Sequence, residues 1–212
     1  MNPSRRRAIW RGVFLAVVIV AVGLFFQQVI RPHLVPKRFS EVAAGKVYRS
    51  GKLTPSATRI VYDRHHIRTI VDLGAYPEGS REEKLAQETA ESLGIERYRF
   101  DLSGDATGNP NYYLFALRLM TDPARQPVLV NCGAGTERTG CTVALYRHLA
   151  EGVPLDTAYA EADAAGHDPD RNPHLKEVLD RWERPIAAAF EDGGLVAGAP
   201  PVPDPKPVHS PQ

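Results

Sequence analysis

The chain has 212 residues, in which 26 Lys and Arg balance 25 Asp and Glu for a formal net charge of +1. A charge this close to zero gives no reason to expect nucleic acid as a partner, and 43% hydrophobic residues exclude a disordered or collagen-like chain. The two cysteines are too few for a disulfide framework and lack CxxC metal-binding spacing. We therefore expect a chain that works without a metal or other cofactor.

Residues 12–30 read GVFLAVVIVAVGLFFQQVI and contain no charged side chain. As a helix they would reach about 28 Å, close to the roughly 30 Å of a bilayer core. We expect one transmembrane anchor; the alternative is a cleaved signal peptide, against which the missing A-x-A-like site argues. The basic flank in residues 1–11 favours a cytoplasmic N-terminus and an extracytoplasmic (periplasmic) domain beyond a single membrane span.

Two further segments have linker composition. Residues 31–39 begin RPHLVPKR and predict a juxtamembrane linker. Residues 192–212 are too rich in proline for a core and predict an extended, disordered tail. The intervening residues 40–191 have the length of one domain.

Strand and helix patterns alternate through this domain. Thr54 and Ser80 are expected as helix N-caps, with Pro55 in the first helical position and Glu83 completing a capping box. An alternating order of this kind predicts an α/β fold with one sheet and helices on both faces. The expected strands are 46–51, 68–74, 95–102 and 127–131, and the expected helices are 54–66, 80–94, 111–122, 138–150, 154–165 and 173–190.

The stretch VLVNCGAGTERTG carries the clearest chemistry in the sequence. A strand ends at Cys132, a turn of small residues follows, and a helix starts near Arg138. Backbone N–H groups of such a turn and a helix N-terminus together bind anions, and their field favours the thiolate form of Cys132. Arg138 can offer two parallel N–H donors to an oxyanion. A thiolate below an oxyanion cradle suits in-line attack on a phosphate monoester.

This stretch resembles the signature His-Cys-x5-Arg-[Ser/Thr] of the cysteine-dependent protein tyrosine and dual-specificity phosphatases. The segments VYRSGKL, RTIVDLG, SLGI, PVLV and RTGCTVALYRHL follow the order of small bacterial and fungal members, so the resemblance covers about residues 40–185. It implies a phosphatase-like catalytic domain over residues 40–191, with a central mixed sheet of four to five strands.

The resemblance also implies roles for individual residues. Cys132 would be the nucleophile that forms a phosphocysteine, Arg138 the phosphate clamp, and Thr139 the hydroxyl that assists departure of the thiolate. The family's general acid is an Asp on the loop after the preceding strand; Asp105 in SGDATGNP is our first choice and Asp101 the competitor. The expected phosphate cradle consists of Gly133, Ala134, Gly135, Thr136, Glu137 and Arg138.

Two positions depart from the family pattern. Asn131 replaces the usual His before the nucleophile, which weakens the electrostatic support for the thiolate while leaving an amide that can orient the loop. Glu137 places a carboxyl next to Arg138, where we expect it to repel polyanions at the rim. That repulsion argues against polyphosphoinositides as substrates.

Other polar residues have ordinary and functional interpretations. Cys141 is expected to be a buried helix residue, with a backup thiol for Cys132 as the alternative. Arg49 and Lys52 are either surface charges or groups that attract an anionic substrate. Arg97 is expected on a solvated strand face.

The main hypothesis is a membrane-anchored cysteine phosphatase acting on phosphotyrosine or phosphoserine/threonine in proteins, or on a small phosphomonoester. Three alternatives stay open. They are a phosphate-binding pseudophosphatase, for which Asn131 is the only support, an inositol phosphate or phosphoinositide phosphatase, and a rhodanese-like sulfurtransferase.

Overall fold

The structure, a computed structural model, describes residues 3–209; the outermost residues of the predicted basic flank and tail, 1–2 and 210–212, lie outside this range. A five-stranded sheet in the order β1-β2-β5-β3-β4 forms its centre. β1 runs antiparallel to β2, and the other neighbours are parallel. The predicted α/β fold with a mixed sheet is confirmed. The strands are β1 Ser40–Ala43, β2 Val47–Gly51, β3 Thr69–Asp72, β4 Glu96–Arg99 and β5 Val128–Cys132.

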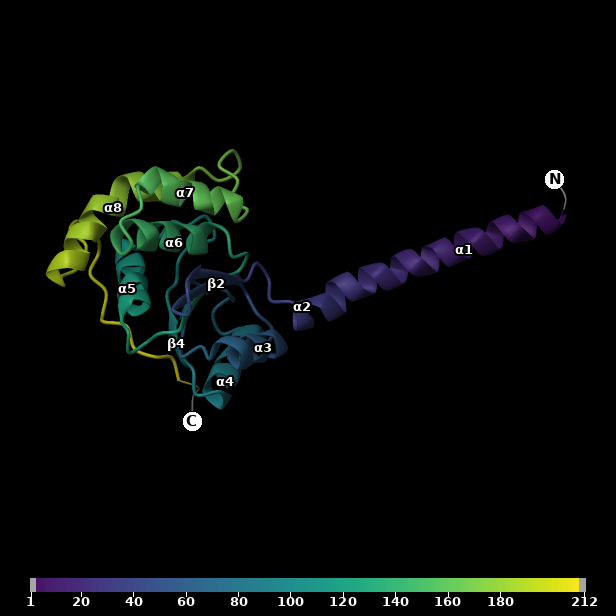
Figure 1. Cartoon of the computed structure of the whole chain (residues 1–212), viewed down its shortest axis with the longest axis horizontal. Coiled ribbons are helices and arrows are strands. Elements are labelled where there is room, and N and C mark those ends of the chain that lie inside the picture. Colours follow the sequence, from purple (N-terminus) through teal and green to yellow (C-terminus); the bar gives the residue numbers. More distant parts are fainter. Residues whose placement is uncertain (1–2, 210–212) are drawn as a thin grey trace.

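Helices cover both faces of this sheet (Figure 1). Successive strand residues point to opposite faces, so Val47 and Val130 join the larger core cluster while Tyr48 and Leu129 join the smaller one. Helices α3 Pro55–His65 and α4 Arg81–Ser92 pack over the smaller cluster. The helices of the larger cluster are α5 Pro110–Thr121, α6 Glu137–Leu149, α7 Leu155–Ala164 and α8 His174–Asp192.

The predicted helix starts are confirmed by their capping geometry. The Thr54 hydroxyl accepts a hydrogen bond from the amide of Ala57, and the Ser80 hydroxyl accepts one from the amide of Glu83. Each cap satisfies a backbone donor that the first helical turn leaves free. The local sequence therefore specifies where α3 and α4 begin.

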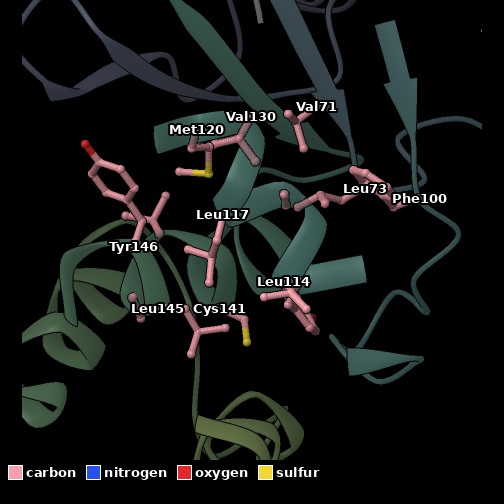
Figure 2. Close-up of a cluster of buried hydrophobic side chains, with 14 of the residues drawn as sticks. Val71, Leu73, Phe100, Leu114, Leu117, Met120, Val130, Cys141, Leu145 and Tyr146 are labelled. Atoms are coloured by element: carbon pink, nitrogen blue, oxygen red, sulfur yellow. The ribbon is translucent and has the colours of Figure 1, made fainter. Parts of the chain in front are cut away.

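Cys141 lies in the larger core cluster, among the side chains that Figure 2 shows between α5, α6 and the sheet. It is fully buried, and burial raises the pKa of its thiol to about 12, against a lowering hydrogen bond with Tyr113. A thiol with such a pKa is not ionised at neutral pH. The prediction that Cys141 is a buried residue of the helix after the loop is confirmed.

Arg97 corrects the sequence prediction. It is only 2% exposed, and its Nη2 lies 2.5 Å from Asp72 Oδ2 on β3. Its Nη1 donates to Gln87 Oε1 at 3.1 Å. The side chain is covered because α4 and the C-terminal tail both pack beside β4, where Val208 N donates to the Arg97 carbonyl. The alternation of polar and apolar residues along β4 does not predict that α4 and the tail bury the Arg97 side chain.

The N-terminal helix projects away from the domain (Figure 1). It consists of α1 Pro3–Phe25, a π-helical turn η1 Phe26–Ile30 and α2 Arg31–Leu34. Within residues 3–209, Val13–Leu34 is one helical stretch long and apolar enough to cross a bilayer, with mean hydropathy 2.6 and none of it buried. A signal sequence would share these properties, so length and composition leave both predicted roles in place.

The predicted linker and tail are both more structured than their composition indicates. Residues 31–34 continue the helix as α2, with Pro32 in the turn that directly follows the π-helical turn η1. In the tail, Val196 is 3% exposed and its amide donates to Asn111 Oδ1 at 2.8 Å. The expected disorder is therefore wrong for residues 192–209. Buried contacts hold this proline-rich segment on the domain, although it forms no helix or strand beyond α8.

Candidate active site

The Cys132 loop lies at the carboxyl edge of three parallel strands. β5 ends at Cys132, and α6 begins at Glu137. The ends of β2 and β3 lie on either side of β5, with Gly51 opposite Cys132 in the register. Ligands bind at this edge in open α/β sheets because the loops there are free of strand pairing.

Close packing between the loop and β2 requires glycine. Gly135 has φ of +82°, and a Cβ there would lie 2.6 Å from the amide nitrogen of Gly51. A Cβ on Gly51 would in turn lie 2.8 Å from the Ala134 carbonyl oxygen. Any side chain at either position would push the loop away from the sheet, so these glycines determine its path.

The loop surrounds the sulfur of Cys132. The side chain is buried, with 1% of its surface exposed. Its Sγ accepts a hydrogen bond from the amide of Gly135 at 3.2 Å. A backbone donor aimed at sulfur stabilises a thiolate, which is the form that acts as nucleophile.

Arg138 is anchored through one edge of its guanidinium. Nη1 donates to the carbonyl oxygens of Leu73 at 2.7 Å and of Leu102 at 3.2 Å. Nη2 lies beside Gly133, since a Cβ there would be 3.3 Å away. Nε is buried and has no hydrogen-bond partner within the described residues. The edge formed by Nε and Nη2 is the one that can bind two oxygens of a phosphoryl group.

Four buried side-chain atoms in residues 3–209 lack a hydrogen-bond partner, and all four belong to this region: Ser50 Oγ, Asn131 Oδ1, Arg138 Nε and Thr139 Oγ1. Ser50 lies opposite Asn131 in the β2–β5 register, and Thr139 follows Arg138 in α6. Buried polar groups in native proteins are nearly always paired. Their concentration around one loop therefore indicates a site built for a polar ligand.

Cationic side chains surround the loop on the β2 side. Arg49 is buried, and its Nη2 donates to the Gly135 carbonyl at 2.8 Å. Burial lowers the pKa of this guanidinium, while the nearby Cys132 raises it. From the segment before β1, Lys37 Nζ donates to the Gly133 carbonyl and Arg38 Nη1 donates to the Ala134 carbonyl. These two residues lie 96 positions before the residues that they contact, so no local pattern predicts the contact.

The expected repulsion of polyanions by Glu137 is not supported by the geometry. Its Oε2 lies 2.5 Å from Nδ1 of His167, whose side chain is fully buried near the start of the loop between α7 and α8. The imidazole Nε2 is in turn 3.1 Å from the Tyr159 hydroxyl. A carboxylate that accepts from His167 is directed at α7 and not at the phosphate cradle, so polyphosphorylated ligands are not excluded.

The two candidate acids, Asp105 and Asp101, have different surroundings. Asp105 Oδ1 accepts from the amide and the hydroxyl of Thr107 at 3.0 and 2.7 Å. Burial raises the pKa of Asp105, but these bonds and the nearby His174 lower it, and the net pKa lies below its usual value. Asp101 is exposed and lies 3.6 Å from Arg99. The predicted acid role of Asp105 stays a prediction.

A metal has no evident place here, since residues 3–209 contain no group of three or more His, Cys, Asp or Glu side chains that could hold one. The donors around Cys132 are backbone amides, a guanidinium and hydroxyls, which suit an anion.

Comparison with known proteins agrees with this chemistry. A model described as the tyrosine phosphatase family matches residues 33–153. Inositol diphosphatase SIW14 of Saccharomyces cerevisiae is 31% identical over 118 residues, which are 54% of this chain and 40% of that protein. Inositol diphosphatase DSP3 of Arabidopsis thaliana is 34% identical over 118 residues, covering 54% and 55%. The chain spans about half the length of these curated relatives.

Solved structures share the fold. The core catalytic domain of the PP-IP phosphatase SIW14 from S. cerevisiae, in complex with citrate, has a TM-score of 0.58 at 24% identity, covering 76% of this chain and 96% of that one. TpbA of P. aeruginosa has a TM-score of 0.59 at 18% identity, covering 73% and 91%.

Proposed function

The chain belongs to the tyrosine phosphatase family, and from that membership we propose that it is a cysteine-dependent phosphatase of inositol polyphosphates that carry a diphosphate group. The family match leaves the sulfurtransferase alternative without support. The observation that carries the substrate class is the set of cations around the cradle, combined with the withdrawal of the Glu137 carboxylate by His167. Two curated relatives named as inositol diphosphatases support the same class.

The reaction follows from the loop geometry. Cys132 Sγ attacks the terminal phosphorus; the S–P bond forms, the bridging P–O bond breaks, and its electron pair leaves with the inositol-bound phosphate. Arg138 Nε and Nη2 bind the equatorial oxygens, where the negative charge of the transition state is spread. Water then attacks phosphorus; a P–O bond forms, the P–S bond breaks, and its electron pair returns to sulfur, while the proton of the water leaves with the inorganic phosphate. The Thr139 hydroxyl is the group placed to donate a hydrogen bond to that sulfur.

Cleavage of a diphosphate makes little demand on Asp105. A departing phosphate is stable as an anion and needs no proton, whereas an alkoxide needs a strong general acid. Burial raises the pKa of Asp105, but the hydrogen bonds from Thr107 bring that pKa below its usual value and so favour the carboxylate. The arrangement therefore fits cleavage of a phosphoanhydride with Asp105 as a loop-ordering carboxylate.

A substrate panel tests this function. The full chain in detergent micelles is assayed with a diphosphoinositol polyphosphate, inositol hexakisphosphate and a phosphotyrosine peptide. We expect kcat/KM for the diphosphate to be about tenfold or more above the others, which corresponds to about 1.4 kcal/mol, and Cys132→Ser to release no phosphate. Higher kcat/KM for the phosphotyrosine peptide would refute the substrate class while leaving the cysteine chemistry in place.

The membrane role belongs to the same proposal. Val13–Leu34 has the length of a span, and the arginines of residues 1–11 favour a cytoplasmic N-terminus by the positive-inside rule. A reporter that works only outside the cytoplasm should then be active when fused after residue 212, and a reporter that works only in the cytoplasm should be inactive there. The full-length chain should also stay in the membrane fraction after high-salt washing. Recovery of a shortened soluble chain would instead identify a cleaved signal peptide.

A further inference from the structure

The segment that leaves the membrane helix is bound to the catalytic loop. The Lys37 carbonyl accepts a hydrogen bond from the amide of Gly51 at 2.7 Å, which ties this segment to the end of β2. Lys37 Nζ lies 3.3 Å from the Gly133 carbonyl oxygen, and Arg38 Nη1 lies 3.1 Å from that of Ala134. Both cations therefore lie at the residues that form the phosphate cradle.

Arg38 adopts a backbone conformation that a long side chain rarely takes. Its φ is +48°, in the left-handed region. Non-glycine residues in this region cost free energy, and such residues gather at functional sites when the surrounding structure holds them there. The conformation brings the guanidinium over the loop, where a Cβ on Gly166 would be 3.4 Å from Arg38 Nε.

A cavity of about 860 Å³ opens beside these cations, lined by residues of α2 and the segment after it and of the starts of α3 and α4. Five basic side chains line it, together with one acidic side chain, Glu82. Its volume lies within the usual range of about 300–1,000 Å³ for ligand pockets. The basic lining residues are Arg31, His33, Lys37, Arg38 and Lys52.

The charges of this cluster influence one another. Burial lowers the pKa of Lys37, and the neighbouring Arg38 and Lys52 lower it further, while Cys132 raises it. Arg38 and Lys52 thus disfavour the charged form of Lys37 beside Cys132. A bound anion would relieve this repulsion.

We propose that Lys37, Arg38 and Lys52 form a second phosphate subsite, which holds another phosphate of the substrate whose terminal phosphoryl group lies in the Cys132 cradle. The subsite rests on the proposed function for its substrate class. It makes the segment that follows the membrane helix part of substrate recognition. A phosphoinositide headgroup has the same chemistry; we assign the site to the soluble substrate because two of the cations contact the cradle itself.

Inhibition measurements test the subsite without requiring that any polyphosphate be hydrolysed. The full chain in detergent hydrolyses an aryl monophosphate, and inhibition constants are measured for inositol hexakisphosphate and inorganic phosphate. Inorganic phosphate competes with the aryl monophosphate by occupying the cradle alone, whereas one hexakisphosphate molecule can bridge both sites. The readout is the inhibition constant for inositol hexakisphosphate divided by that for inorganic phosphate.

The double variant Lys37→Gln/Arg38→Gln should raise this ratio about tenfold, the size expected when charge-assisted phosphate contacts are lost. Lys52→Gln, which leaves the juxtamembrane segment intact, should raise it in the same direction. Lys46→Gln is the matched control, because this exposed residue precedes the opposite end of β2. An unchanged ratio in both the double variant and Lys52→Gln overturns the subsite, even if the diphosphate is the preferred substrate.

A vesicle arm separates the two phosphate sources. The full chain is reconstituted in phosphatidylcholine vesicles with or without a minor fraction of phosphatidylinositol 4-phosphate. A soluble-substrate subsite predicts the same ratio in both. If the phosphorylated lipid raises the ratio of the unmodified chain but not that of Lys37→Gln/Arg38→Gln, the headgroup occupies the site and the assignment to substrate is wrong.

Discussion

His167 binds the Glu137 carboxylate, with 2.5 Å between Nδ1 and Oε2, at the first residue of α6. The imidazole is buried, and its Nε2 is 3.1 Å from the Tyr159 hydroxyl. With Nδ1 donating to the carboxylate and Nε2 accepting from Tyr159, both ring nitrogens are satisfied. This pair holds the one acidic side chain of the loop away from the phosphate cradle.

His167→Ala should therefore raise KM for an inositol polyphosphate about tenfold, because a released carboxylate near the cradle repels the substrate. Glu137→Gln alone should change KM less than about threefold, since its charge is already directed elsewhere. The double variant His167→Ala/Glu137→Gln should have a KM close to that of the unmodified chain. KM from phosphate release is the measurement, with thermal unfolding to confirm folding. Equal losses in His167→Ala and in the double variant would contradict this account.

Arg138→Lys should lower kcat/KM by about 10² to 10³, the cost of losing a preorganised oxyanion donor. A lysine cannot hold the Leu73 carbonyl and still offer two donors to a phosphoryl group. The matched control is Arg49→Lys, since Arg49 uses Nη2 for a hydrogen bond to the Gly135 carbonyl that an ammonium can also make. Comparable losses in the two variants would mean that Arg138 only shapes the loop.

Asp105→Asn should separate the two leaving groups. For a diphosphate substrate we expect less than about threefold loss in kcat, because no proton is needed; for an alkyl phosphate, a loss of about 10² would reveal a general acid. The folded-state pKa of Asp105 is lowered, so its carboxylate stabilises the fold above the usual Asp pKa, and this stability is lost as pH falls through the lowered value.

The pH profile follows from the same sign. For diphosphate hydrolysis, the dependence of kcat on pH between about pH 5 and 8 should be the same in the unmodified chain and in Asp105→Asn. If kcat of the unmodified chain falls with rising pH in this range and kcat of Asp105→Asn does not, a protonated Asp105 takes part in the reaction. The corresponding Asp101→Asn profile serves as the comparison, because that carboxyl is exposed and paired with Arg99.

Asp72→Asn should lower the free energy of unfolding by about 3–5 kcal/mol, the usual cost of removing one partner from a buried ion pair. Arg97 would keep its buried charge, and Asp72 also accepts from the amide of Ala75 at 2.6 Å. Urea unfolding followed by circular dichroism measures the change. Asp122→Asn is the surface control, because its contact with Arg125 is part-exposed; a loss no larger than that of the control would show that the buried pair is not stabilising.

Much of the fold follows from local sequence. Thr54 and Ser80 cap α3 and α4 as predicted, because a cap needs only the backbone of the next turn. The strand, the small-residue turn and the helix around Cys132 are likewise specified by adjacent residues. For the same reason Cys132 and Arg138 could be assigned to one anion site before any tertiary contact was known.

The tertiary structure decided which distant groups surround that site. His167 reaches Glu137 only because the loop after α7 returns to α6, and Lys37 and Arg38 reach Gly133 and Ala134 only because the segment before β1 folds back over the end of β2. Residues this far apart along the chain leave no periodic or spacing signal. The sequence by itself thus determined the strand, turn and helix around Cys132 through short-range backbone geometry. Long-range packing determined the charge that the cradle presents to its substrate.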